Sequence, residues 1–285
     1  MTSSVPVVAS AFLETLANTM KDRYTHGHHA SVVAHHATRT VENSAAFLIP
    51  HLVAGARLLD VGCGPGSVTR GFVSLVEPGD VVGVDVSPDV IEIAARETQA
   101  AGVENVEFRV GDVYALPFED AEFDVVYAHQ VLQHLTEPVV ALTEMRRVVR
   151  SGGVVGVRDA DYGAFVWTPE HPALTRWLEI YHRVTEHNGA QADAGRHLVR
   201  WFHKAGFDET VVSTSNWHYA DPAARRWWGE GWAVRALESS FAHQAVEYGY
   251  CTRDDLKEIS EAFRWWSVQD DAFFLVPHVE VVAFR

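Results

Sequence analysis

The sequence predicts an α/β fold in which helices cover both faces of one doubly wound, mostly parallel sheet. Between residues 51 and 160, short apolar runs alternate with helix-like segments. Continuous apolar runs of this length are typical of strands buried on both faces. The loops between them are short. With 285 residues, 47% of them hydrophobic, the chain can form one sizeable core and an insertion, or two small domains.

The apolar runs that we expect to form strands share β-branched residues and turn signals at their ends. They cover residues 57–61, 81–85, 106–110, 123–127, 154–157, 207–214 and 279–284. The first run leads into a glycine-rich loop, the second ends on Asp85, and the third precedes Gly111 and Asp112. Because ligands of open α/β sheets bind outside the carboxyl ends of the strands, these chain positions are candidates for a binding site.

Helix signals lie between the strands. Ser87 is a helix cap with Pro88 in the first turn, and Gly102 follows the helix end. Pro138 begins a second helix, which we expect to end at Gly152 and Gly153. Further along, the segment 252–255 has the pattern of a capping box for a last helix.

All nine tryptophans lie beyond residue 160, so the composition changes there. Trp227, Trp228, Trp232, Trp265 and Trp266 either wall a ligand or form the core of a lid, and we expect most of them to be core. We divide the chain into an N-terminal helical cover (1–50), a cofactor-binding α/β core (51–160), the rest of the core with a helical insertion (161–215), an aromatic-rich helical lid (216–276) and a final core strand (277–285).

Composition and charge exclude several classes of protein. The net charge of −15 repels phosphate backbones, so we expect no nucleic-acid partner. No stretch approaches the roughly 18 apolar residues that a membrane-spanning helix needs. Cys63 and Cys251 form neither a disulfide framework nor a zinc pattern, and the N-terminus does not resemble a signal peptide. We therefore expect a cytoplasmic protein.

The central motif is a strand that runs into three closely spaced glycines, Gly62, Gly64 and Gly66. Glycine permits sharp turns and lets the backbone approach a ligand, and the helix that follows has free N–H groups. A nucleoside triphosphate loop would have a lysine after Gly66, and none is present. In a dinucleotide loop the third glycine would come one residue later, although that pattern varies.

Two acids after the loop narrow the choice of ligand. Asp85 ends the next strand, 19 residues after Gly66, where a carboxylate accepts hydrogen bonds from both ribose hydroxyls. This suits NAD and S-adenosylmethionine equally. Asp112 follows the third strand, where it can accept a hydrogen bond from the exocyclic amine of adenine.

As an ordered set, these motifs resemble the class I S-adenosylmethionine-dependent methyltransferases, in particular the small-molecule branch similar to the enzymes of ubiquinone and menaquinone biosynthesis. The matching segments are LLDVGCGPGSVT (58–69), VVGVDVS (81–87), GDVYALPFEDAEFDVVYAHQVLQHL (111–135) and VVRSGG (148–153). The resemblance implies a Rossmann-like seven-stranded sheet whose last strand is antiparallel. It also implies that S-adenosylmethionine is the cofactor.

The resemblance implies cofactor-binding roles along these motifs. The residues are Gly62, Cys63, Gly64 and Gly66 around the methionine part, Asp60 at its amino end, Asp85 at the ribose with its neighbours Val86 and Ser87, Asp112 with Val113 at the adenine, and His129 along the cofactor. In related enzymes an aromatic residue of the N-terminal cover approaches the methionine end, and Tyr24 is the candidate here.

Candidates for a catalytic base are His134 and His129, which flank the end of the fourth strand. His134 is either this base or a structural residue bonded to backbone, and His129 suits a cofactor-lining role better. The run His26, His28, His29, His35 and His36 lacks cysteine and carboxylate partners at ligand spacing, so we expect no metal.

These features predict a methyltransferase that acts on a small molecule. The tryptophans hint at an apolar or aromatic acceptor, while the sequence does not name the acceptor atom or an oligomeric state. One alternative is an NAD-dependent oxidoreductase, which would share the glycine loop and Asp85 but not the Gly111-Asp112-Val113 segment. Another is a non-catalytic protein that binds S-adenosylmethionine.

Overall fold

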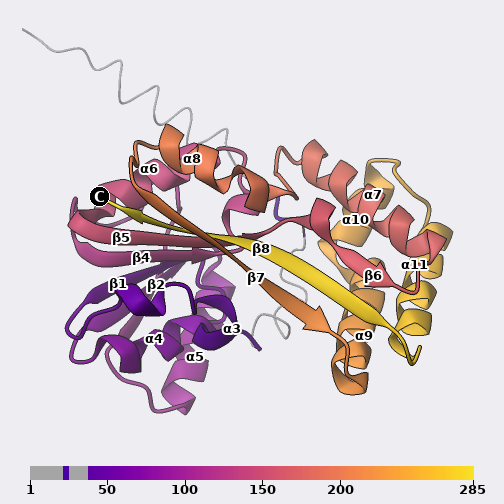
Figure 1. Cartoon of the computed structure of the whole chain (residues 1–285), viewed down its shortest axis with the longest axis horizontal. Helices are drawn as coiled ribbons and strands as arrows, with labels where there is room; N and C mark the ends of the chain where they lie inside the picture. Colours follow the sequence, from indigo (N-terminus) through magenta and orange to yellow (C-terminus); the bar gives the residue numbers. More distant parts are fainter. Residues whose placement is uncertain (1–21, 26–37) are drawn as a thin grey trace, which may run out of the picture.

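The computed structural model describes residues 22–25 and 38–285, and its centre is one eight-stranded sheet (Figure 1). The strands are β1 (Arg57–Val61), β2 (Asp80–Asp85), β3 (Val106–Val110), β4 (Phe123–His129), β5 (Val149–Ala160), β6 (Val166–Thr168), β7 (Thr210–Tyr219) and β8 (Phe273–Phe284). Their order is β3-β2-β1-β4-β5-β8-β6, with β7 also paired to β8. Strands β1 to β5 are parallel, and β8 is antiparallel to its neighbours, as expected for the last strand.

The expected number of seven strands was wrong, because β6 is an additional strand. It has only three residues and pairs with the first residues of β8, from Val166 opposite Leu275 to Thr168 opposite Phe273. So short a segment has no hydrophobic period of its own, and it is a strand because β8 extends beyond the core to meet it. The strands β7 and β8 are both longer than expected and run from the core to the lid (Figure 1).

Helices cover both faces of the core. On one face lie α3 (Val41–Ser44), α4 (Ser67–Val76) and α5 (Pro88–Ala100), and on the other lie α6 (Pro138–Val148) and α8 (Leu198–Lys204) (Figure 1). Short 3-10 turns complete the core at η1 (Ile49–His51), η2 (Leu132–His134), η3 (Tyr162–Ala164) and η4 (Ala194–His197). Phe72 of α4 and Met145 of α6 are fully buried in separate apolar clusters, one on each face of the sheet.

The expected helix signals act largely as predicted. The Ser87 hydroxyl accepts a hydrogen bond from the Val90 amide at 3.4 Å, and Thr252 and Asp255 form a reciprocal capping box. The helix that begins at Pro138 ends at Val148 rather than at the glycine pair, because β5 starts at Val149 and includes Gly152 and Gly153. No helix in the described part of the chain is long and apolar enough to cross a membrane.

The remaining described helices form a separate aromatic cluster (Figure 1). They are α7 (Pro172–His187), α9 (Pro222–Glu238), α10 (Ser240–Glu247) and α11 (Arg253–Ser267). From here on we call this cluster the lid, although it includes α7 from outside the expected lid range 216–276. Trp177, Trp232 and Trp266 are almost completely buried in this cluster. The lid therefore has a hydrophobic core of its own beside the sheet.

Candidate functional site

A cavity of about 290 Å³ lies at the carboxyl ends of the core strands. It is the candidate site for the expected cofactor, and we call it the cofactor cavity. Most of the residues predicted to bind a cofactor line it: Tyr24, Asp60, Gly62, Cys63, Gly64, Asp85, Val86, Asp112, Val113 and His129. The structure therefore brings together residues that are up to 69 positions apart along the core, from Asp60 to His129. Of the predicted set, Gly66 and Ser87 are not among its lining residues.

The glycine loop follows β1 and is held against the end of β2. The Gly62 amide donates to the Val84 carbonyl at 2.7 Å, and the Gly64 amide donates to Oδ2 of Asp85 at 3.1 Å. Gly62 has a left-handed φ of +69°, and a Cβ there would lie 2.4 Å from a methyl group of Val131. Glycine is thus required at this position both by the turn and by close packing.

Gly66 and Ser87 have structural positions beside the cavity. Gly66 is the N-cap of α4 with φ +75°, and a Cβ on it would lie 2.7 Å from the Phe108 ring. Ser87 caps α5. Gly66 thus begins α4 and Ser87 begins α5, and both helices border the glycine loop.

The acids of the cavity differ in their surroundings. Asp60 is buried, and its Oδ2 accepts a hydrogen bond from the Thr69 hydroxyl at 2.6 Å. Burial, with a smaller contribution from the charge of Asp85, raises the pKa of Asp60 to about 7. Asp85 is partly exposed, and its Oδ1 accepts from the Ser87 amide at 3.0 Å. Oδ1 of Asp112 accepts from the Tyr114 amide at 2.9 Å.

His129 lines the cofactor cavity at the end of β4, and its tautomer follows from its partner. Nδ1 lies 3.2 Å from the Arg158 carbonyl, which only accepts, so Nδ1 carries the hydrogen. Burial, together with the charges of Arg39 and Arg158, holds the pKa of His129 well below its usual value. The buried Nε2 has no hydrogen-bond partner among the described residues. His129 is therefore a neutral imidazole whose Nε2 is an acceptor.

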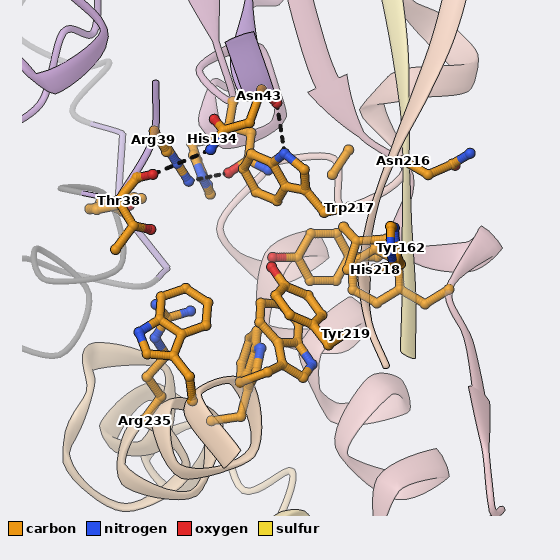
Figure 2. A pocket seen from close by; sticks show the side chains of 18 residues that line it. Thr38, Arg39, Asn43, His134, Tyr162, Asn216, Trp217, His218, Tyr219 and Arg235 are labelled. Carbon is orange, nitrogen blue, oxygen red and sulfur yellow. Dashed lines mark hydrogen bonds between the residues drawn. The ribbon is translucent and has the colours of Figure 1, made fainter. Parts of the chain in front are cut away.

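A second cavity of about 450 Å³ lies between the core and the lid (Figure 2). It is the candidate site for a methyl acceptor, and we call it the acceptor cavity. Tyr24, Arg39, Gln130 and His134 line both cavities and so mark the junction between them. Aromatic side chains of the lid, of η3 and of β7 dominate the rest of the lining, among them Tyr162, Trp217, Tyr219, Trp227, Trp228 and Trp232. Arg39, Trp217 and Gln130 were not predicted as site residues from the sequence. Gln130 was missed although it lies within the recognised segment 111–135.

Of the five tryptophans considered from the sequence, three reach this cavity. Trp228 and Trp232 are buried and also belong to the lid core, whereas Trp227 is 37% exposed. Trp265 and Trp266 do not line the cavity. Trp217 of β7 joins the wall, and its indole Nε1 donates to the Asn43 carbonyl at 2.8 Å (Figure 2).

His134 lies in η2 at the junction. Its Nε2 is 3.0 Å from the side-chain amide nitrogen of Gln133, and its ring meets Tyr24 edge-on with the ring centroids 4.7 Å apart. Burial, and to a lesser extent the charge of Arg39, lowers the pKa of His134 to about 3. Such a histidine is neutral at pH 7 and binds a proton weakly, which reduces its strength as a general base.

The segment 22–25 connects the core with the lid above the junction. Oδ1 of Asp22 accepts from the amide and hydroxyl of Thr136, at 2.9 and 2.8 Å. On the lid side, the side-chain nitrogen of Asn188 donates to the Thr25 hydroxyl at 3.1 Å. These contacts hold Tyr24 at both cavities, and burial raises the pKa of its phenol.

The histidine run 26–36 lies outside the described residues. Within residues 22–25 and 38–285, no cluster of three or more histidine, cysteine, aspartate or glutamate side chains is suited to hold a metal ion.

Comparison with known proteins identifies the family. The model of a family described as a methyltransferase domain matches residues 52–206. An uncharacterized methyltransferase of Schizosaccharomyces pombe is 32% identical over 268 residues, which cover 91% of this chain and 95% of that protein. The chain belongs to the methyltransferase family.

Two further comparisons agree with the resemblance seen in the motifs. A demethylmenaquinone methyltransferase of Staphylococcus aureus is 41% identical over 102 residues, which cover 35% of this methyltransferase and 42% of that enzyme. A phosphoethanolamine N-methyltransferase of Haemonchus contortus, solved with S-adenosylhomocysteine, has the same fold, with a TM-score of 0.53 and 18% identity over 84% of this methyltransferase and 52% of that chain. The cofactor of the methyltransferase is S-adenosylmethionine.

Proposed function

We propose that this methyltransferase transfers the methyl group of S-adenosylmethionine to a small-molecule acceptor by in-line displacement. One observation carries the proposal: the cofactor cavity and the acceptor cavity share a junction lined by Tyr24, Arg39, Gln130 and His134. The acceptor cavity, at about 450 Å³, is in the range of small-molecule sites and has the aromatic lining typical of them. A net charge of −15 argues against a nucleic-acid acceptor.

The chemistry of the cofactor cavity fits the proposed ligand. Gly62 and Gly64 leave room beside the backbone, Asp60 offers an acidic group for the ammonium of the methionine part, and Asp85 and Asp112 offer oxygens for the ribose and the adenine amine. The orphaned Nε2 of His129 offers a further acceptor. We assign these residues, with Cys63, Val86 and Val113, to cofactor binding, and Gly66 and Ser87 to support of the loop.

Arg39 is the candidate for the carboxylate of the methionine part. Its guanidinium donates to Oε1 of Gln130 and lies over the Trp217 ring at 5.6 Å, and it forms no ion pair with an acidic side chain of the described residues. A guanidinium binds a carboxylate through two parallel hydrogen bonds. We place the carboxylate at the junction for this reason.

Bound S-adenosylmethionine supplies a methyl group that its positive sulfur already activates. The protein then has to hold the acceptor atom in line, exclude water and take up a proton where the acceptor carries one. Tyr24 and the lid close the junction, which serves the first two tasks. Nε2 of His134 already accepts a hydrogen bond from the side-chain nitrogen of Gln133, so this neutral ring at the junction is placed to position the acceptor rather than to act as a strong base.

Titration calorimetry with S-adenosylmethionine, S-adenosylhomocysteine and NAD tests the cofactor assignment. We expect micromolar affinity for the two adenosyl ligands, no detectable binding of NAD, and about tenfold or more weaker binding to Asp85→Asn, because hydrogen bonds to a charged group contribute about 1.5–3 kcal/mol. Equal affinity of Asp85→Asn and wild type would contradict the role of Asp85.

S-adenosylmethionine with a chiral methyl group tests the in-line transfer. A single displacement inverts the configuration of the methyl carbon, whereas two successive displacements retain it.

A further inference from the structure

The acceptor cavity contains a buried cation that the proposed reaction does not use. Arg235 projects into it from α9 of the lid, opposite Arg39 and Trp217 in Figure 2. The residue is 6% exposed, and its Nε is buried with no hydrogen-bond partner among the described residues. Burial of an unpaired charge is unfavourable, so proteins normally provide a partner for it.

The described lining of the acceptor cavity provides no negative charge. It contains no aspartate or glutamate, although the protein has 38 acidic residues. The phenols of Tyr162 and Tyr219 face Arg235, but burial raises the pKa of both, so they remain uncharged near neutral pH. The ring of Trp232, 5.2 Å from the guanidinium carbon, offsets part of the charge without using the N–H donors.

Arg235 is also distinct from the cation at the junction. Arg39 lines both cavities and has the hydrogen bond to Gln130, whereas Arg235 lines the acceptor cavity only. Burial lowers the pKa of Arg235 to about 10, with a further lowering by the charge of Arg39, so Arg235 remains charged at pH 7. Even with the cofactor carboxylate on Arg39, the charge of Arg235 would remain without a counter-ion.

We propose that the acceptor is a planar, aromatic anion, and that Arg235 binds its acidic group while the tryptophan and tyrosine rings of the acceptor cavity stack on its flat body. The inference rests on the proposed small-molecule acceptor and names its class. In this arrangement Arg235 is a specificity-determining residue. It anchors the end of the acceptor remote from the cofactor cavity, and the atom that receives the methyl group lies toward the junction.

Planar carboxylates paired with their neutral amides test this class of acceptor. The probes are benzoate, naphthoate and anthracene carboxylate, each compared with its amide by calorimetry in the presence of saturating S-adenosylhomocysteine. We expect at least one acid to bind wild type about tenfold or more tightly than its amide, because hydrogen bonds between charged groups contribute about 1.5–3 kcal/mol. In Arg235→Gln this preference should fall to about threefold or less.

Arg226→Gln is the matched control, because Arg226 lies on the same helix, is exposed, and its replacement makes the same change in charge. It should keep the preference for the acid. The affinity for S-adenosylhomocysteine reports whether each variant is folded, since Arg235 does not line the cofactor cavity. If Arg235→Gln does not fold, a crystal structure of wild type with naphthoate tests the inference. We expect the naphthoate carboxylate to contact the Arg235 guanidinium, and a carboxylate elsewhere would contradict the inference.

Three results would overturn the inference: acids and amides that bind wild type equally or not at all, a preference for the acid that persists in folded Arg235→Gln, or a carboxylate placed away from Arg235. Failure of the proposed function looks different. Wild type that does not bind S-adenosylhomocysteine contradicts the cofactor site itself, whereas binding of that ligand without a preference for acids contradicts only the role of Arg235.

Discussion

Gln130 donates a hydrogen bond from its side-chain nitrogen to Nε2 of His278, 2.9 Å away on β8. The direction follows from the other ring nitrogen, since Nδ1 of His278 lies 3.0 Å from the Val276 carbonyl and must donate to it. Oε1 of Gln130 accepts from Arg39. A relay therefore runs from the final strand through Gln130 to the guanidinium at the junction of the two cavities.

The relay predicts that Gln130→Asn weakens cofactor binding about threefold to tenfold, the effect of one lost hydrogen bond of about 0.5–1.5 kcal/mol. Asparagine is the appropriate replacement because Gln130 has a left-handed φ of +54°, which asparagine tolerates and alanine does not. Calorimetry with S-adenosylhomocysteine measures the effect.

A double-mutant cycle with Arg39→Gln provides the control for the relay. We expect the Gln130→Asn substitution to have almost no further effect once Arg39 is replaced, since Gln130 acts through that side chain. Additive losses in the double variant would show that Gln130 contributes independently of Arg39.

Gly62→Ala should be more harmful than an alanine at another left-handed glycine. Gly102 provides the comparison, with φ +65° and open space around it, whereas the Cβ at Gly62 would meet Val131 at 2.4 Å. Left-handed strain alone destabilises by about 1–2 kcal/mol, and we expect that loss in Gly102→Ala. In Gly62→Ala the clash with Val131 adds to this loss of stability, and we expect the affinity for the cofactor to fall as well.

Denaturant unfolding and titration with S-adenosylhomocysteine measure the two effects of the glycine substitutions. Equal losses of stability in both variants, with unchanged affinity in Gly62→Ala, would contradict the close packing of the loop.

Cofactor binding should weaken as the pH falls below about 7. The pKa of Asp60 is raised to about 7, mainly by burial, so acid protonates its carboxylate and removes the partner of the ligand ammonium. Binding then has to release one proton, and the affinity falls by up to about tenfold per pH unit. Calorimetry between about pH 5.5 and 7.5 measures this slope. In Asp60→Asn the slope should disappear, and its persistence there would assign the proton to another group.

The pH dependence of the turnover rate should show no inflection caused by His134 between about pH 5 and 8. Its pKa is lowered to about 3, chiefly by burial, so the ring stays neutral over that range. We expect His134→Ala to slow the reaction through loss of positioning, while its pH profile keeps the shape of the wild type. An inflection near pH 6.5 that is present in wild type and absent from His134→Ala would show instead that His134 titrates as a base.

The sequence predicted the core well, because its signals are local. Most of the parallel strands contain a short apolar run, and the caps at Ser87 and Thr252 use side chains within three residues of the amides they bond. The chain order also placed Asp60, Asp85 and Asp112 near one another, since parallel strands bring their carboxyl ends to one edge. Only β6 was missed there, a three-residue strand without a period of its own.

The sequence alone thus determined the parallel part of the sheet, the glycine-rich loop and the family of the methyltransferase. The tertiary structure alone decided the acceptor side, where the partners are far apart in the chain: Gln130 meets His278 across 148 positions, and Trp217 meets Asn43 across 174. In the sequence Arg235 is one more charged residue on a helix, and only the packing of the lid shows that it is buried with no carboxylate in the described lining of its cavity. Hydrophobic periodicity and helix capping depend on residues only a few positions apart in the chain, so they can be recognised in the sequence. Burial and charge pairing depend on which distant segments pack together.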